Sequence, residues 1–209
     1  MKSYLNNPTL KADRIAIMKA HQAADELVRG ATEGRRNDGT FRGCAVVCTI
    51  GSYSHAAYET ELGIPRQLAR IEDGIFESLP IERAMQWPLE FLEAVPVGAN
   101  LLISYWQFME WLLVDPQDGV IRFAKTQRTK DSIIRVAGLY QSRLKGETPA
   151  AAAAAADAYA DAAAYTAAAD AAAAAAYAAY AAADAAYAVR QQARVAQADK
   201  LLSLLSQAE

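Results

Sequence analysis

The side chains best suited to bind a metal or to act as a nucleophile lie close together in this chain of 209 residues. Both cysteines, Cys44 and Cys48, and one of the two histidines, His55, fall in the stretch GCAVVCTIGSYSHAAYE, and the other histidine is His21. Two thiolates and two imidazoles make a complete tetrahedral ligand set for zinc. The sequence therefore raises the question of a zinc site.

The spacing of the cysteines sets a condition on such a site. Residues four apart are separated by about 6 Å along a helix but about 13 Å along a strand. One zinc ion, with Zn–S bonds of about 2.3 Å, requires the helical or a tightly turned arrangement. The intervening AVV and the following Thr49 and Ile50 favour a strand. We therefore favour two buried packing thiols, and the zinc site is the alternative.

A thiol enzyme is a further alternative. A cysteine nucleophile needs a nearby histidine to raise its thiolate fraction and a third group to orient that histidine. Asp25 follows His21 by four residues and Glu59 follows His55 by four, so either carboxylate can meet its histidine on one helix face.

Two further groups of charged residues attract attention. Arg35, Arg36 and Arg42 lie in a glycine-rich loop and form a candidate site for a small anionic ligand, although no P-loop signature follows. Asp73 and Glu77 share one helix face, as a pair of acid–base carboxylates would. We interpret them as surface charge because of the neighbouring basic residues.

The elements that must position these residues are mostly helices. Apolar residues recur at helical spacing in several segments, and a loop separates the first two of them. The expected helices are 10–29, 65–79, 81–95, 101–114 and 131–144, and the expected loop is 30–43. The segment LLISYWQFMEWLLV is apolar on every side, so we expect it to be the central buried helix.

The composition changes at Gly146-Glu147-Thr148-Pro149, which is typical of one helix ending and another beginning. Of the 60 residues that follow, 33 are alanine, the strongest helix former. Five tyrosines of this tract fall on one arc of about 120° at helical periodicity. They are Tyr159, Tyr165, Tyr177, Tyr180 and Tyr187. Because tyrosines are typical contact residues, this stripe predicts a protein partner or self-association through the C-terminal helix.

Charge and composition exclude some classes of protein. Up to Pro149 the chain carries 18 basic and 18 acidic residues, so it lacks the basic excess of a general nucleic-acid binder. No apolar run is long enough to span a membrane without charges. The two cysteines and the absence of a secretory leader in MKSYLNNPTLKADR predict the reducing cytoplasm.

The run GCAVVCTIGSYSHAAYETELGIPRQLARIEDGIFESLP resembles an uncharacterised family of bacterial and bacteriophage proteins. The similarity extends to HQAAD at the start, to WPLEFL and PVGA further on, and to ADKLL after the alanine-rich tract. The resemblance implies no particular activity, substrate or cofactor. It implies a bacterial or phage accessory protein, a class that often acts by binding host machinery.

Together these observations predict an all-α protein with a helical body at residues 1–146 and an alanine-rich helical tail at residues 147–209. The expected function is that of a non-catalytic interaction protein without a cofactor. We expect it to bind a host protein or a small anionic ligand as an inhibitor or sponge. The alternative is a zinc protein or thiol enzyme built on His21, Cys44, Cys48 and His55.

Overall fold

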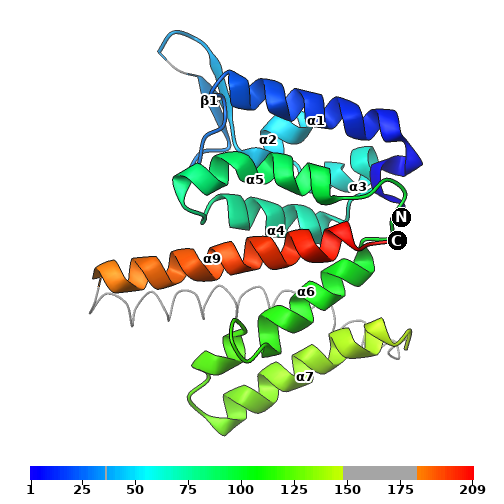
Figure 1. The fold of residues 1–209 in the computed structure, drawn as a ribbon, viewed down its shortest axis with the longest axis vertical. Helices are drawn as coiled ribbons and strands as arrows, with labels where there is room; N and C mark the ends of the chain where they lie inside the picture. The colour runs from blue at the N-terminus through cyan, green and yellow to red at the C-terminus, as the bar shows by residue number, and fades with distance from the viewer. Residues whose placement is uncertain (36, 148–182) are drawn as a thin grey trace. The chain divides into compact units, whose positions relative to one another are not determined.

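A computed structural model describes residues 1–35, 37–147 and 183–209, which form helices and one two-stranded sheet (Figure 1). The fold is all-α, as the sequence predicts. The elements in chain order are η1 (Ser3–Asn6), α1 (Pro8–Ala23), β1 (Glu33–Arg35), β2 (Phe41–Gly43), α2 (Ala45–Ile50), α3 (Ala57–Leu62), α4 (Arg66–Phe76), α5 (Ile81–Ala94), α6 (Leu102–Val114), η2 (Val120–Phe123), α7 (Gln127–Leu144) and α9 (Ala183–Ser206).

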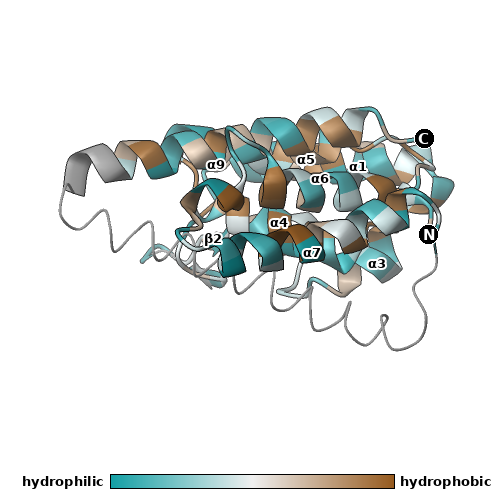
Figure 2. Cartoon of the chain, turned by 90° about the horizontal axis from the view of Figure 1, so that it is seen from below, coloured by the Kyte–Doolittle hydropathy of each residue, from teal (hydrophilic) through white to brown (hydrophobic). Residues whose placement is uncertain are grey.

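The chain divides into two compact units, and the first comprises residues 1–105 and 197–209. In this unit α5 contacts both α1 and α4. Helix α2 also packs against α1 and α4. Figure 1 shows α1, α5 and α4 side by side. Hydrophobic and hydrophilic residues alternate along the helices, which Figure 2 shows as brown and teal patches. Trp87 is the largest of the fully buried side chains in this core.

The second unit comprises residues 106–196. Its helix α7 begins after Thr126, whose side chain accepts a hydrogen bond from the backbone of Thr129 as an N-cap. The same helix is followed by Gly146 in the left-handed conformation, with φ of 75°. The sequence signal for a helix end at Gly146 is thereby confirmed.

Several sequence expectations need correction. The first helix ends at Ala23, because the chain turns at Asp25, which has a φ of 54°. The expected loop 30–43 contains the antiparallel pair β1 and β2. The strand preference of residues 45–50 is wrong, since they form helix α2, which is buried on all sides. Burial and the left-handed Gly51 at its end outweigh the strand propensity of its β-branched residues. Helix α6 is not buried all round, because Ile103 is 48% exposed.

The end of α9 belongs to the first unit, where Ala198, Leu201 and Leu205 are fully buried. These three residues lie three and four apart, which is the spacing of one helix face. The backbone N–H of Asn100 donates to the carbonyl of Glu209 at 2.8 Å, so the C-terminus is also anchored there. The predicted boundary at residues 146 and 147 is therefore not the boundary of the first compact unit, which includes residues 197–209.

Among the described helices, none combines the length and the apolar character that crossing a lipid bilayer requires.

Candidate functional site

A small pocket in the first unit brings together residues from four separate segments. We call it the Asp73 pocket, and its volume is about 210 Å³. Its described lining residues are Gly30, Ala31, Thr32, Cys44, Tyr53, Asp73 and Glu77. They include two carboxyl groups and no basic side chain, and the charge of the nearby Arg29 acts on Glu77.

Helix α4 supplies Asp73, and Glu77 is the residue that caps its C-terminal end. Its apolar residues Leu68, Ile75 and Phe76 are buried in the core, and this fixes the rotation of the helix. Asp73 and Glu77 then fall on one face, one turn apart, and the N–H of Glu77 donates to the carbonyl of Asp73 at 3.0 Å. The sequence prediction that they share a face is confirmed.

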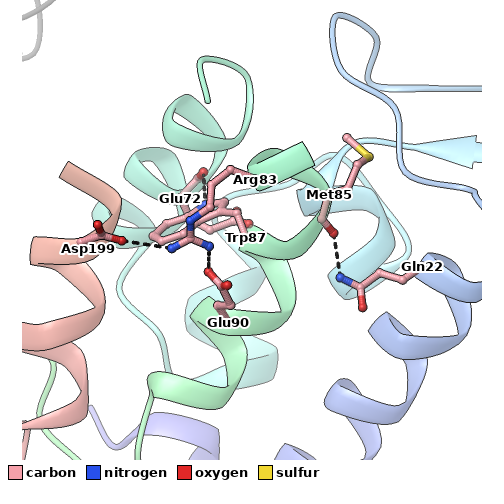
Figure 3. A network of polar contacts seen from close by, with 7 residues as sticks. All are labelled: Gln22, Glu72, Arg83, Met85, Trp87, Glu90 and Asp199. Atoms are coloured by element: carbon pink, nitrogen blue, oxygen red, sulfur yellow. Dashed lines mark hydrogen bonds and ion pairs between the residues drawn. The ribbon is translucent and has the colours of Figure 1, made fainter. Parts of the chain in front are cut away.

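A buried hydrogen bond anchors α4 to α5 next to the pocket. The indole N–H of Trp87 donates to the backbone carbonyl of Glu72 at 3.0 Å, as Figure 3 shows. In the same network Arg83 pairs with Glu90 and with Asp199, the latter at 3.1 Å. The helix that carries the pocket carboxylates is therefore held by its neighbour α5, and α5 is linked to the end of α9.

The loop before β1 forms the opposite wall. Gly30 has a φ of 76°, a left-handed conformation that glycine adopts without strain. Its N–H donates to Glu77 Oε2 at 2.7 Å, which ties the loop to α4. The N–H of Cys44 donates to the carbonyl of Thr32 at 2.9 Å, which ties the other end of the loop to the start of α2.

Asp73 is the least exposed carboxylate of the pocket. The residue is 9% exposed, whereas Glu77 is exposed at the rim. Its Oδ2 accepts a hydrogen bond from the hydroxyl of Tyr53 at 3.1 Å and lies 3.0 Å from Nε2 of His55. A carboxylate only accepts, so this pair places the proton of His55 on Nε2. Its Oδ1 is buried without a hydrogen-bond partner.

Burial changes the protonation of the neighbouring acids. Glu72 is fully buried, and burial raises its pKa well above the ordinary value of 4.5, with the charge of Asp73 adding to the effect. Its Oε1 has no hydrogen-bond partner. Desolvation also raises the pKa of Glu77, and the Gly30 N–H works against this rise. Glu72 therefore holds its proton more tightly than an exposed glutamate does.

The cysteines lie on a helix rather than a strand. Cys44 is the residue before α2 and Cys48 lies within it, and the N–H of Cys48 donates to the carbonyl of Cys44 at 3.0 Å. Each is 1% exposed. Burial raises the pKa of Cys44 to about 11 and that of Cys48 to about 12, so both are thiols at neutral pH. This protonation state opposes the role of a thiolate nucleophile or metal ligand.

The two histidines pair with different carboxylates. Nδ1 of His21 lies 2.6 Å from Glu26, which is one residue beyond the expected Asp25. His55 pairs with Asp73 rather than with the expected Glu59, which instead accepts from Arg66 at 2.9 Å. The predicted carboxylate partners of the two histidines are therefore wrong. His21 meets Glu26 across a turn, and His55 meets Asp73 from a separate segment, so neither pair lies along one helix face.

No group of three or more His, Cys, Asp or Glu side chains within residues 1–35, 37–147 and 183–209 has the arrangement of a metal site.

The structure separates two of the three arginines of the predicted anion site. Arg35 pairs with Phe41 across the ladder and Arg42 pairs with Gly34. Paired residues share a face and neighbours alternate, so Arg35 and Arg42 lie on opposite faces of the ribbon. The Arg35 guanidinium donates to the carbonyl of Gly39 at 2.8 Å. Arg36 lies outside the described residues.

The predicted tyrosine stripe falls mostly outside the part of the chain that the structure describes. This applies to Tyr159, Tyr165, Tyr177 and Tyr180. Tyr187 is described, and it is 56% exposed on α9. Contact through the stripe stays a prediction.

The Asp73 pocket was not found from the sequence. Its two carboxylates were placed correctly on one helix face, but they were interpreted as surface charge. The missing signal was burial, since Asp73 directly follows Glu72, an acid that occupies a fully buried position of the helix. Geometrically, the pocket offers two carboxylates, one aromatic wall and a neutral thiol, which suits binding of a small positively charged group.

The chain matches no protein-family model, no curated protein and no solved structure.

Proposed function

We propose that the protein is a non-catalytic binding protein that holds a small organic cation in the Asp73 pocket. The observation that carries the proposal is the burial of the Asp73 carboxylate at the pocket. It lines the pocket, is 9% exposed, and keeps one carboxylate oxygen buried without a hydrogen-bond partner. A carboxylate held largely out of water is stabilised by a positive charge close to it, and a cation in the pocket supplies that charge.

The remainder of the lining supports a cation over an anion. Glu77 adds a second carboxylate at the rim, and the seven described lining residues include no lysine, arginine or histidine. The Cys44 thiol contributes no charge, because burial raises its pKa to about 11. For this pocket we therefore propose a cation in place of the anionic ligand expected from the arginine-rich loop.

The test is calorimetric titration of the full-length protein with n-butylamine. Asp73→Asn should weaken binding at least tenfold, since a hydrogen bond to a charged group contributes about 1.5–3 kcal/mol. Glu26→Gln is the matched control, because Glu26 also pairs with a histidine but does not line the pocket. It should leave the affinity within about twofold.

A second pair of variants keeps the test independent of the stability of Asp73→Asn. Thr32 lies on the exposed wall of the pocket, so Thr32→Lys brings a competing ammonium group to it. Thr60→Lys makes the same change at an exposed position of α3. Loss of butylamine binding in Thr32→Lys alone supports the proposal. Equal binding by Thr32→Lys and Thr60→Lys overturns it.

A further inference from the structure

The second unit contains a strongly basic segment that the overall charge of the chain conceals. Residues 119–146 contain seven basic side chains and one acidic side chain, Asp131. The rest of the first 149 residues contains 11 basic and 17 acidic side chains, so the two parts cancel. The neutral total therefore does not describe the surface of η2 and α7.

Five of these basic side chains are close together in the chain and are exposed. They belong to η2, to the turn after it and to the first half of α7. We call them the basic surface, and they are Arg122, Lys125, Arg128, Lys130 and Arg135. Arg128 and Arg135 are seven residues apart, which is close to two helical turns, so they project from the same face of α7.

The positive charge of the basic surface is not neutralised by neighbouring acids. Within the residues that the structure describes, no carboxylate lies at ion-pair distance from any of the five cations. Asp131 accepts a hydrogen bond from the side-chain amide of Gln127 at 2.8 Å. Arg135 donates to the neutral hydroxyl of Ser132 at 3.2 Å. The charge therefore stays available to a partner.

Two exposed cations of the first unit, in contrast, are paired with acids. Nζ of Lys19 lies 3.0 Å from Glu93, and the guanidinium of Arg66 lies 2.9 Å from Glu59. The second unit thus differs from the first in presenting several cations without such partners, and this combination attracts a polyanion.

Two exposed apolar side chains lie among these cations. Phe123 is 47% exposed, and the guanidinium of Arg122 lies over its ring, 4.5 Å from the centroid. Ile134 is 51% exposed, and it lies one helical turn after Lys130 and directly before Arg135. A partner of the basic surface therefore meets apolar side chains together with positive charge.

This combination favours an anionic lipid surface over a nucleic acid. Anionic headgroups attract Lys and Arg, and the boundary with the acyl chains just below them accepts apolar side chains. A phosphate backbone attracts the same cations but offers Ile134 no apolar environment. Bases stack on open aromatic rings, but Arg122 already covers one face of Phe123.

From these observations we infer that the segment 122–135 is a docking surface for membranes that contain anionic lipids. Its cations contact the headgroups, and Phe123 and Ile134 reach the boundary with the acyl chains. Such docking is peripheral and needs no spanning helix. The inference does not rest on the proposed function, because the Asp73 pocket belongs to the first unit and the basic surface to the second.

The test is co-sedimentation of the full-length protein with vesicles of phosphatidylcholine alone and of an equal mixture with phosphatidylglycerol. The protein should sediment with the mixed vesicles only, and added salt should release it because ions screen exposed charges. A DNA duplex with the same total negative charge is the competitor, and retention on the vesicles in its presence supports the inference. Failure to bind the mixed vesicles, equal binding to phosphatidylcholine alone, or displacement of most of the protein by the duplex overturns it.

A double variant tests the cations. Arg128→Gln with Lys130→Gln should lower the partition coefficient for the mixed vesicles at least tenfold, since one cation near an anionic surface contributes about fivefold. Lys19→Gln with Arg66→Gln removes the same charge from the paired cations of the first unit and is the matched control. It should stay within about twofold of the wild type. Equal losses would show that net charge rather than the basic surface causes binding, and would overturn the inference.

A single variant tests the apolar contact. Ile134→Ser should lower the partition coefficient for the mixed vesicles about two- to fivefold, because less apolar area is then buried in the lipid. Ile81→Ser changes an isoleucine of the same 51% exposure at the start of α5 and is the matched control. Equal partition coefficients of the two variants would show that Ile134 does not reach the lipid, and would overturn the choice of a membrane as the partner.

Discussion

The two histidine–carboxylate pairs of the first unit are alike in chemistry but differ in their surroundings. His21 and Glu26 are each 23% exposed in their side chains, and their pair closes the turn that follows α1. In the second pair the side chains of His55 and Asp73 are 20% and 12% exposed. The second pair borders a pocket, shares its carboxylate with Tyr53 and lies next to the buried Glu72.

This difference shows that a hydrogen-bonded histidine is not by itself a functional sign. The Glu26 pair stabilises a turn, since the N–H of Glu26 also donates to the carbonyl of His21 at 3.0 Å. The Asp73 pair leaves one buried oxygen unused and faces a pocket. The two pairs therefore differ in their surroundings, and only the Asp73 pair borders the pocket.

The largest expected difference concerns one aromatic residue of each region: Trp87, whose indole donates to the carbonyl of Glu72, and Phe41, which lies beside His21. Trp87 is fully buried, so Trp87→Ala should lower the free energy of unfolding by about 3–5 kcal/mol. Phe41, whose ring centroid lies 5.7 Å from that of His21, is only partly buried, and Phe41→Ala should cost clearly less. Urea denaturation monitored by circular dichroism measures both. If both variants lost the same free energy of unfolding, Trp87 would contribute no more to stability than Phe41 does, which would contradict the prediction.

A second prediction uses the buried acid that only the Asp73 region contains. The pKa of Glu72 is raised in the folded state, so folded protein retains a proton that the unfolded chain releases above about pH 4.5. The wild type therefore loses stability as pH rises from this value towards the folded pKa. Glu72→Gln cannot ionise, so its stability relative to wild type should rise by about 1.4 kcal/mol per pH unit over this interval.

Denaturation between pH 4 and pH 8 measures this slope. Thr60→Ala changes an exposed residue that does not titrate and is the control, so its difference from wild type should stay constant with pH. A flat difference between Glu72→Gln and wild type would mean that Glu72 ionises normally in the folded protein.

The sequence predicted those features that repeat locally along the chain. Helices α4 and α5 begin after Pro65 and Pro80 as expected, since their apolar residues recur every three or four positions. Helix α2 was missed because six residues rich in β-branched side chains contain no helical period. Its helical state depends on burial by other segments.

The candidate site was less predictable because its contacts join distant segments. The face shared by Asp73 and Glu77 is a local property of one helix and was predicted. The pairing of His55 with Asp73 spans 18 residues, and the link from Gly30 to Glu77 spans 47. Such contacts depend on how helices pack, which neither spacing nor composition specifies.

A third prediction compares the histidines directly. His55→Ala leaves the buried Asp73 with one fewer donor and should cost about 1–3 kcal/mol in stability. His21→Ala should cost less, because Glu26 is more exposed and water can replace the imidazole. Chemical denaturation at pH 7 measures both variants. A larger loss in His21→Ala would show that the turn after α1 depends more on its pair than the pocket does.

The smallest expected effect is the pH dependence of amine binding in the Asp73 pocket. Desolvation raises the pKa of Glu77, and its ionised form favours a bound cation, so butylamine affinity should fall as pH is lowered through this pKa. A primary amine stays protonated from pH 5 to pH 8, which leaves the change to the protein. The decrease should be about two- to fivefold.

The same titration on Glu77→Gln is the control, because Asp73, His55 and Arg29 are also close to the pocket. If the pH dependence of the butylamine affinity is unchanged in Glu77→Gln, another group is responsible for it. If the affinity no longer depends on pH, Glu77 is the carboxylate at the rim that meets the ligand.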